Sequence, residues 1–260
     1  MRQGAISGYA RFEVLAFRDR MTRFSGGWIG PYWAQITPLV WIGFLVLLFD
    51  FLERVPPIHA TAANFVATGV LPYILFRQII TSMSRTVIAN RHLRYITPIN
   101  NTDILLSTAA VEGCNILFTS ALIFGSLYWM EQAAAPADIQ GVIFNLSLLF
   151  LLSTSVGKLI ASIGLVSDSW ARAFPIFLRP LFWVSGIFYV ATELPKPLQD
   201  TLSWNPLLHI TEGLREAYFL SYSSPIYDVN YTLICICVAF LCSIAFERGV
   251  LTKVAQRYRI

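Results

Sequence analysis

The sequence predicts an all-α integral membrane protein with six transmembrane helices, an N-terminal amphipathic interfacial helix and a re-entrant helical hairpin between the fifth and sixth spans. Two observations predict this fold class. Hydrophobic residues make up 56% of the 260 residues, and aromatic residues (14%) exceed charged residues (13%), so the chain is too apolar for an ordinary globular domain. Its apolar segments are also long, several of them near the roughly 20 residues that cross a bilayer core.

The elements are expected to form one domain, residues 1–260. Residues 1–28 combine arginines with apolar side chains, which favours a helix lying on the cytoplasmic surface. The polar and basic stretch 88–101 links the second and third spans, and residues 192–222 are expected to form outer re-entrant helices. The predicted spans cover residues 32–50, 62–83, 104–130, 139–166, 175–191 and 229–247.

The re-entrant hairpin is predicted from prolines. The segment 175–191 is apolar and aromatic, but slightly short for a full crossing. Pro195 and Pro197 break it, and a second break falls at Asn205-Pro206, where Asn is a good N-cap and Pro suits the first helical position. Broken helices at membrane depth are tolerated only where protein or a wet cavity satisfies the backbone. The broken element therefore indicates a translocation path.

The distribution of Lys and Arg predicts the orientation. One side of the predicted membrane collects most of the basic residues, including those of the N-terminal helix and the C-terminal tail. The other side is rich in Asp and Glu, and its basic residues are Arg54, Lys196 and Arg215. We therefore expect a multi-pass protein with both termini in the cytoplasm.

Four ionisable residues lie inside predicted spans: Arg77, Glu112, Lys158 and Arg179. Each is about one to two turns from the cytoplasmic end of its span at 3.6 residues per turn, so they are expected to form a layer at similar depth. In one reading, Glu112 neutralises Lys158 or Arg77 and the other side chains snorkel to the surface. In the other, Arg77 and Arg179 meet an anionic group such as a lipid phosphate or an acidic sugar.

Aromatic residues concentrate on the first span and on the broken fifth element. Aromatic faces stack on the apolar faces of sugar rings, but they also pack cores and anchor at interfaces. Taken together, they predict a smooth, weakly binding surface for a sliding cargo. With the two arginines, the predicted canal residues are Tyr32, Trp41, Phe44, Arg77, Phe177, Arg179, Trp183, Phe188 and Tyr189.

Sequence motifs for chemistry are missing. The string nearest to a phosphate-binding loop, SVGKLI at 155–160, lacks the first Gly and the Ser or Thr. The metalloprotease, serine-hydrolase and paired-cysteine patterns are absent as well. We therefore predict no catalytic residue, no metal site, no cofactor bound by this chain and no nucleic-acid partner.

Three stretches carry a resemblance to a known family. They read RDRMTRFSGGWIGPYWAQITPLVWI, GVLPYILFRQIITSMSRTVIANRHLRYITPINNTDILLS and SWNPLLHITEGLREAYF. They look like the family's basic entry into the first span, its second span with the following loop, and its outer helix that begins with Asn-Pro. The motif residues are Gly69, Phe76, Asn90, Leu93, Pro98, Asn205, Pro206 and Arg215. With these features the chain resembles the permease subunit of ABC-2 type polysaccharide exporters, the capsular polysaccharide exporters above all.

The resemblance implies a non-enzymatic transport subunit in the bacterial inner membrane. It implies a homodimer bound to two copies of a separate ATPase, which would hold ATP and Mg. The loop 88–101 would contain the coupling helix, with Asn90, Arg91, Leu93, Arg94, Tyr95 and Pro98 at the ATPase; the other reading is a basic loop without a partner. Membrane lipids, a lipid-linked polysaccharide and a periplasmic or outer-membrane export protein would be the further partners.

Other functions stay open at this point. A permease for O-antigen or teichoic acid would share every feature above. A permease for small drugs or lipids would not need a continuous aromatic canal. A membrane-embedded transferase would need clustered acid and base residues, which the sequence does not offer.

Overall fold

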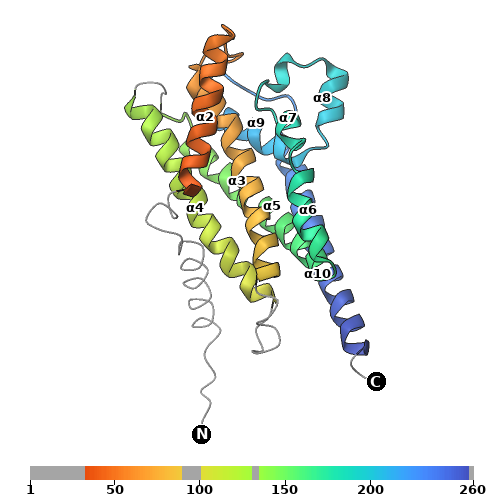
Figure 1. The fold of residues 1–260 in the computed structure, drawn as a ribbon. Helices are drawn as coiled ribbons and strands as arrows, with labels where there is room; N and C mark the ends of the chain where they lie inside the picture. Colours follow the sequence, from red (N-terminus) through yellow and green to blue (C-terminus); the bar gives the residue numbers. More distant parts are fainter. Residues whose placement is uncertain (1–32, 90–100, 131–134, 258–260) are drawn as a thin grey trace.

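The computed structural model describes residues 33–89, 101–130 and 135–257, and in these residues all regular structure is helical (Figure 1). The long helices are α2 (Trp33–Phe51), α3 (Ala62–Ala89), α4 (Asn101–Trp129), α5 (Ile139–Gly164) and α10 (Val229–Arg257). Shorter elements lie between α5 and α10 in the chain: α6 (Asp168–Phe177), α7 (Leu181–Val184), the 3₁₀ turn η3 (Ala191–Glu193), α8 (Lys196–Leu202) and α9 (Pro206–Tyr218).

Within the described residues, four helices are long and apolar enough to cross a membrane. They are Ala62–Val87 of α3, Thr102–Trp129 of α4, Ile139–Gly164 of α5 and Val229–Gly249 of α10. The apolar part of α2, Ile36–Phe51, is shorter. The all-α membrane class is therefore confirmed for this part of the chain. The six spans, the re-entrant hairpin and the interfacial helix 1–28 stay predictions, and 1–28 lies outside the described residues.

Helix α3 is the centre of the bundle. In its most apolar window 72% of the residues are buried, against 11% for α10. Leu71, Leu75, Ile79 and Met83 are fully buried and spaced four residues apart, so they form one apolar stripe. Helices α2, α4 and α5 pack against α3, and α10 packs against α5. The outward face of α2 is thereby left open.

The second predicted span was expected to end at residue 83, but α3 continues to Ala89. Hydropathy falls at Ser84, which predicted the end of the span. In the structure Ser84 and Thr86 are buried, and the Thr108 hydroxyl of α4 donates to the Thr86 hydroxyl at 3.3 Å. Packing against a neighbouring helix therefore extends α3 through a polar stretch.

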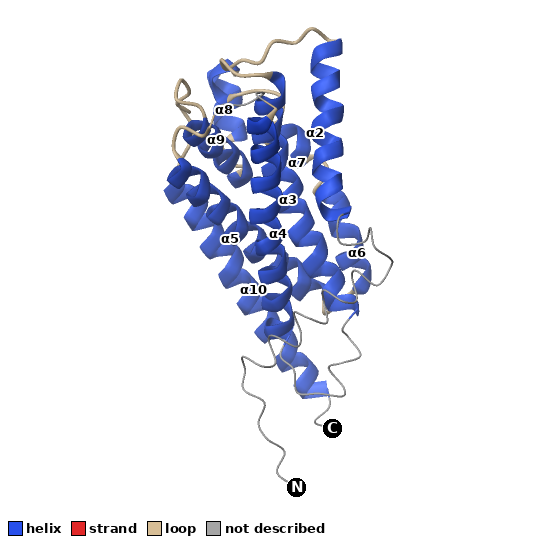
Figure 2. Ribbon diagram, turned by 90° about the vertical axis from the view of Figure 1, so that its left-hand side faces the viewer, coloured by secondary structure: helices blue, strands red, loops and turns tan. Residues whose placement is uncertain are grey.

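The fifth predicted span, 175–191, is not one helix. Helix α6 begins earlier, at Asp168, and Pro175 lies inside it. The break follows at Pro180, which lacks an N–H to donate, and continues past the four-residue α7 to Gly186, whose φ of +74° glycine reaches readily. Figure 2 shows α8 and α9 at the same end of the molecule as the loop after α2. Between α6 and α9 the chain is interrupted three times: after α6, after α7 and after α8.

The start of α9 is as predicted. Asn205 accepts a hydrogen bond of 3.0 Å from the N–H of Leu207, and Pro206 is the first helical residue. The same Asn205 side chain donates to the carbonyl of Val184 at 3.0 Å, and Gln199 donates to the carbonyl of Ala191 at 2.8 Å. Side chains thus satisfy backbone groups that the breaks leave without helical partners.

Candidate functional site

A cavity of about 510 Å³ lies between α2, α3 and the broken element. Its lining comes from α2, from α3 and from the segment that runs from the turn after α6 to the loop after α7. Its lining is mostly aromatic and aliphatic, with two arginines: Trp41, Phe44, Leu45, Leu48, Tyr73, Ile74, Arg77, Arg179, Phe182, Trp183 and Phe188. Three elements that are distant in sequence therefore form one concave site.

The aromatic wall is built around Phe182. Its ring centroid lies 5.8 Å from that of Trp41 and 5.1 Å from that of Tyr73. Trp183 and Phe188 stack with centroids 5.3 Å apart and an interplanar angle of 28°. Such edge and offset contacts are the favoured arrangements of aromatic pairs. The wall is therefore a continuous aromatic surface that crosses from α2 to the loop after α7.

This surface faces outward from the bundle. Trp183 is 66% exposed, Phe44 is 56% exposed and Trp41 is 40% exposed. Large apolar side chains left open in this way mark a surface that contacts lipid, ligand or another protein chain. The cavity is therefore a groove on the side of the helix bundle rather than a closed chamber.

Arg77 and Arg179 enter the groove from different elements. Arg77 is half-buried on α3, and Arg179 is exposed in the turn between α6 and α7. Tyr73 lies one turn before Arg77, and its hydroxyl donates to the carbonyl of Leu178 at 3.4 Å. The charges of both arginines act on this hydroxyl. Among the described residues, no carboxylate lies within ion-pair distance of either guanidinium. Within the described ranges, the positive charge of the groove is therefore not balanced by a neighbouring carboxylate.

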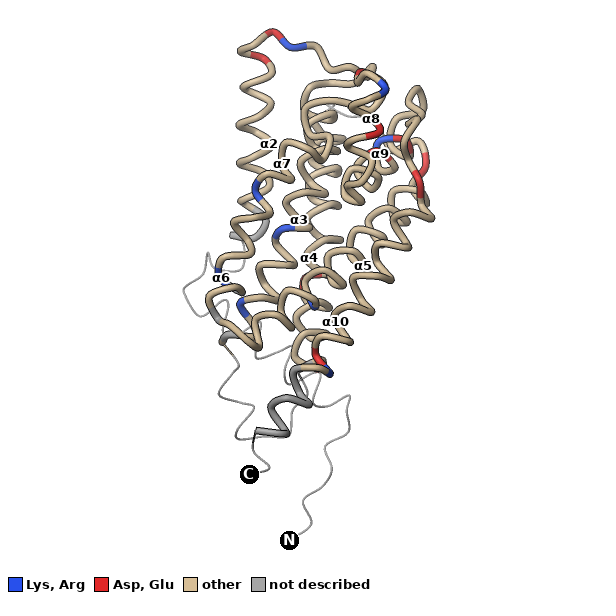
Figure 3. The backbone as a smooth tube through the Cα atoms, turned by 90° about the vertical axis from the view of Figure 1, so that its right-hand side faces the viewer, with Lys and Arg blue, Asp and Glu red and all other residues tan. Residues whose placement is uncertain are grey.

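Arg77 lies farther from the end of its helix than predicted. Helix α3 continues for 12 residues after it (78–89), which is about three turns at 3.6 residues per turn, not one to two. Figure 3 shows most Asp and Glu positions towards the two ends of the molecule, with a Lys or Arg position part-way along α3. An arginine at the centre of a spanning helix costs about 2.5–3.5 kcal/mol on insertion scales. A residue retained at such a cost calls for a partner or a ligand.

The predicted neutralising pair is replaced by other contacts. Lys158 on α5 lies 3.9 Å from the carboxylate of Glu247 on α10, and over the ring of Phe240. Glu112 instead accepts hydrogen bonds from Gln78 at 3.2 Å and Ser82 at 2.5 Å. Of the two partners considered for Glu112, Lys158 therefore pairs with Glu247 of α10 instead.

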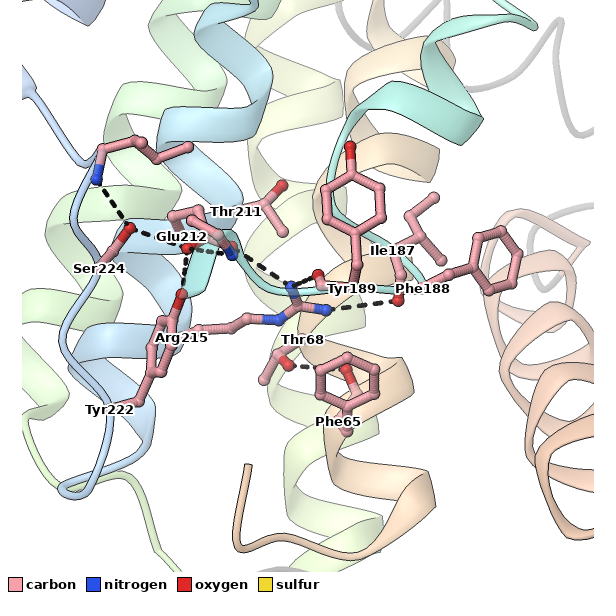
Figure 4. A network of polar contacts seen from close by, with 12 residues as sticks. Phe65, Thr68, Ile187, Phe188, Tyr189, Thr211, Glu212, Arg215, Tyr222 and Ser224 are labelled. Atoms are coloured by element: carbon pink, nitrogen blue, oxygen red, sulfur yellow. Dashed lines mark hydrogen bonds and ion pairs between the residues drawn. The ribbon is translucent and has the colours of Figure 1, made fainter. Parts of the chain in front are cut away.

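A buried ion pair lies beside the loop that carries Phe188 (Figure 4). Arg215 on α9 has no exposed surface and lies 3.5 Å from the carboxylate of Glu212. Its guanidinium donates to the carbonyls of Tyr189 at 2.7 Å and Ile187 at 3.4 Å, and it sits 4.3 Å from the centroid of Phe65 on α3. The loop that carries Phe188 is thereby fixed to both α9 and α3.

Two hydroxyl groups also donate hydrogen bonds to Glu212. The hydroxyl of Ser224 donates to the Glu212 carboxylate at 2.8 Å, and the hydroxyl of Tyr222 donates to it as well. Burial first, and then the Glu212 charge, raise the pKa of Tyr222, which lies in the loop between α9 and α10. The phenol therefore keeps its proton and acts as a donor at neutral pH. One oxygen of the Glu212 carboxylate thus accepts both hydrogen bonds, while the other has no hydrogen-bond partner among the described residues and lies 3.5 Å from the Arg215 guanidinium.

Comparison with known proteins identifies the family. The profile described as ABC-2 type transporter matches residues 10–219. The chain belongs to the ABC-2 type transporter family. It is 25% identical over 236 residues to the polysialic acid transport protein KpsM of Escherichia coli, covering 91% of this chain and 92% of that protein.

Two further relatives match most of this chain and most of their own length. One is the capsule polysaccharide export inner-membrane protein BexB of Haemophilus influenzae, 24% identical over 83% of this chain and 81% of its own length. Another is the capsule polysaccharide export inner-membrane protein CtrC of Neisseria meningitidis serogroup A, 23% identical over 91% of both chains. The resemblance found in the sequence is confirmed. These relatives are inner-membrane export proteins by name.

In this ABC-2 family member, the structure brings six of the nine predicted canal residues to one groove. They are Trp41, Phe44, Arg77, Arg179, Trp183 and Phe188. Phe177 is exposed and packs near Phe174 outside the groove. Tyr189 contributes its backbone carbonyl to Arg215 instead of lining the groove. Tyr32 lies outside the described residues, as do the predicted ATPase contacts Asn90, Arg91, Leu93, Arg94, Tyr95 and Pro98.

Five lining residues of this ABC-2 chain were not in the predicted set, and two of them, Tyr73 and Phe182, are aromatic. Tyr73 precedes Arg77 by four residues, a spacing that places both on one face of a helix. Phe182 precedes Trp183 directly and is the hub of the aromatic wall. The spacing could have revealed Tyr73, whereas the central place of Phe182 depends on contacts between elements.

Proposed function

We propose that this chain is the transmembrane subunit of an ATP-driven exporter that moves a lipid-linked, capsular polysaccharide across the inner membrane. Two copies would place their grooves face to face and form a canal at the homodimer interface. The observation that carries the proposal is the aromatic groove, which is open on the outward face of α2 and α7. The names of its relatives, which mention polysialic acid transport and capsule polysaccharide export, point to the same class of cargo.

The groove suits a polymer that must slide. Stacking on an aromatic face holds a sugar ring by its apolar side and needs no particular linkage. Phe182, Trp183 and Phe188 offer such faces in sequence along the wall. Because each contact is weak and resembles the next, a chain of sugars could advance without a deep energy well at any one position.

In the proposed topology, six spans leave both termini in the cytoplasm, and α8 and α9 form the re-entrant hairpin. Helices α2, α3, α4, α5 and α10 would be spans, and the broken run of α6 and α7 the fifth. The satisfied backbone at Val184 and Ala191 supports this arrangement, since broken backbone needs such partners at membrane depth. The hairpin would face the periplasm, where a periplasmic or outer-membrane export partner would receive the polymer.

Energy would come from a separate subunit. We propose two copies of an ATPase that hold ATP and Mg, while this chain binds no cofactor and catalyses no reaction. The coupling helix would lie in 88–101, directly after α3, whose cytoplasmic half continues from the groove. A displacement of this loop would thus also move Arg77 and Tyr73, because one continuous helix carries both residues up to the loop.

The proposal is tested by removing the aromatic wall. Trp183→Ala and Phe188→Ala are expressed with the ATPase and glycan-synthesis genes of the same locus, and glycan is measured on the cell surface and inside the cell. We expect surface glycan to fall several-fold while glycan accumulates inside. Trp170→Ala is the matched control, because Trp170 is an exposed tryptophan of α6 outside the groove.

Membrane levels of each variant are measured in parallel, so that a folding defect is recognised. Normal surface glycan in the Trp183→Ala and Phe188→Ala cells at normal protein levels would contradict the proposal. A changed profile of resistance to small drugs in those cells, with normal glycan, would assign the groove to drug or lipid export.

A further inference from the structure

We propose that Arg77 and Arg179 form a binding site for an anionic group of the cargo, a carboxylate or a phosphate, within the aromatic groove. The inference rests on the proposed function, because it takes the groove as part of the cargo's path. It adds a chemical class to that function: the cargo carries negative charge where it passes these two residues.

The first reason is the contrast with other basic residues in the same bundle. Arg215 has Glu212 at 3.5 Å, and Lys158 has Glu247 at 3.9 Å. The described part of the chain offers no such carboxylate to Arg77 or Arg179. Charges within a membrane domain face one another or a ligand, and these two guanidiniums, unlike those of Arg85 and Arg172, line the groove where a ligand could meet them.

The second reason is convergence. Arg77 comes from the middle of α3, and Arg179 comes from the turn between α6 and α7, yet both line one cavity. Tyr73 lies within the field of both and ties the two elements together through its bond to Leu178. The turn that carries Arg179 is thus held against the helix that carries Arg77. Two cations placed in this way concentrate positive potential in the groove.

The third reason is chemical fit. A guanidinium presents a planar fork of donors that matches a carboxylate or a phosphate. Beside it stands the stacked pair of Trp183 and Phe188, which offers a flat apolar face for a sugar ring. An acidic sugar has both features in one residue, and a sugar joined to a lipid phosphate has them in neighbouring groups.

Paired probes distinguish the two sources of negative charge, a sugar carboxylate and a lipid phosphate. The full-length chain in phosphatidylcholine nanodiscs is titrated with a sialic acid hexamer and with maltohexaose, which differ in carboxylates. It is also titrated with farnesyl phosphate and with farnesol, which differ in phosphate. Quenching of tryptophan fluorescence reports binding, because Trp41 and Trp183 line the groove. Arg77→Gln and Arg179→Gln are compared with the charge-keeping Arg77→Lys and Arg179→Lys.

We expect at least one charged probe to bind about tenfold or more tightly than its neutral partner, since hydrogen bonds to charged groups are the strong ones. Each Gln variant should lose most of that difference and each Lys variant should keep part of it. Arg85→Gln and Arg172→Gln are the matched controls, because they lie on α3 and α6 outside the groove, and they should bind as the wild type does.

A preference for the sialic acid hexamer alone assigns the site to the glycan, and a preference for farnesyl phosphate alone assigns it to the lipid anchor. Equal binding of charged and neutral partners, failure of both charged probes to bind, or Gln variants that bind like the wild type would overturn the inference. Trp183→Ala tests the groove separately. If it weakens binding of both hexamers while the Gln variants change nothing, the anion site is refuted and the glycan path stands.

Discussion

The guanidinium of Arg215 on α9 donates a 2.7 Å hydrogen bond to the backbone carbonyl of Tyr189, 26 residues earlier, in the loop after α7. Phe188, the neighbour of Tyr189, lines the groove. One buried contact therefore connects an ion pair that no cargo can reach to the wall that cargo is proposed to touch. The charges of α9 position the groove; they do not line it.

Replacing Arg215 by Met should loosen that wall. The variant removes the donor to Tyr189 and leaves Glu212 buried without its cation, a loss that typically costs about 3–5 kcal/mol. We expect a lower melting temperature in detergent and faster hydrogen exchange in residues 185–190. Thermal unfolding and exchange mass spectrometry measure the two effects.

The double variant Arg215→Met with Glu212→Gln is the control for the buried charge. Because it removes both charges, it should regain part of the lost stability while residues 185–190 stay loose. An Arg215→Met protein as stable as the wild type, with unchanged exchange in 185–190, would contradict the positioning role of Arg215.

Gly69 on α3 packs against the same loop, so a substitution at Gly69 is a second test of how the loop is positioned. A Cβ at this position would lie 2.7 Å from a guanidinium nitrogen of Arg215 and 3.0 Å from the Cα of Ile187, so Gly69→Ala must displace the loop or the ion pair. Overpacking of this kind costs about 1–3 kcal/mol. We expect a lower melting temperature and reduced export.

Gly43→Ala on α2 is the matched control, since a Cβ there would meet nothing within 4 Å. Alanine is better than glycine in a helix interior by about 1 kcal/mol, so this variant should be as stable as the wild type or more so. Equal behaviour of the two alanine variants in the melting experiment would show that close packing at Gly69 does not matter.

Hydropathy and capping rules predicted what depends on one helix at a time. Long apolar runs located α3, α4, α5 and α10, and the Asn205-Pro206 pair located the start of α9. These features depend on residues a few positions apart, which the sequence displays directly.

Hydropathy and capping rules could not predict contacts between residues on different helices. Lys158 finds Glu247, which is 89 positions later (247 − 158), because α5 and α10 pack side by side. Arg215 was predicted as an outer basic residue, yet it is fully buried by the loop after α7. Six canal residues were found because aromatic and cationic composition marks them, but which rings meet depends on how the broken element folds back.

The raised pKa of Tyr222 predicts that the stability of the folded protein falls at high pH. Burial and Glu212 raise its pKa above the ordinary value of 10.0, so between the two values the unfolded chain loses a proton that the folded chain keeps. The stabilisation is therefore fully present below about pH 10 and is lost as the pH rises through the raised pKa. The loss should approach about 1.4 kcal/mol per pH unit in that window.

Tyr222→Phe isolates this effect, because it removes the hydroxyl and keeps the ring. At pH 7 the variant should be less stable by about 1–3 kcal/mol, the cost of a lost buried hydrogen-bond partner. Above pH 10 the difference in melting temperature between the two proteins should shrink. A difference that is constant from pH 7 to pH 11 would mean that Tyr222 does not titrate differently in the folded protein.

The proposed canal requires that two copies meet through the groove side of α2. In a symmetric dimer the same patch faces itself, so residues of that patch should crosslink to their own counterparts. Leu47 on α2 is 69% exposed and Leu241 on α10 is 64% exposed, which makes them a matched pair on different faces. The four native cysteines, Cys114, Cys235, Cys237 and Cys242, are first replaced by serine.

Leu47→Cys and Leu241→Cys are then treated with a short bismaleimide in native membranes, and the products are separated by size. We expect a covalent dimer from Leu47→Cys only, since α10 would face lipid. Export activity of the untreated variants confirms that each is assembled. A dimer from Leu241→Cys, with none from Leu47→Cys, would place the subunit contact on α10 and leave the groove facing lipid, where it could not enclose a hydrophilic polymer.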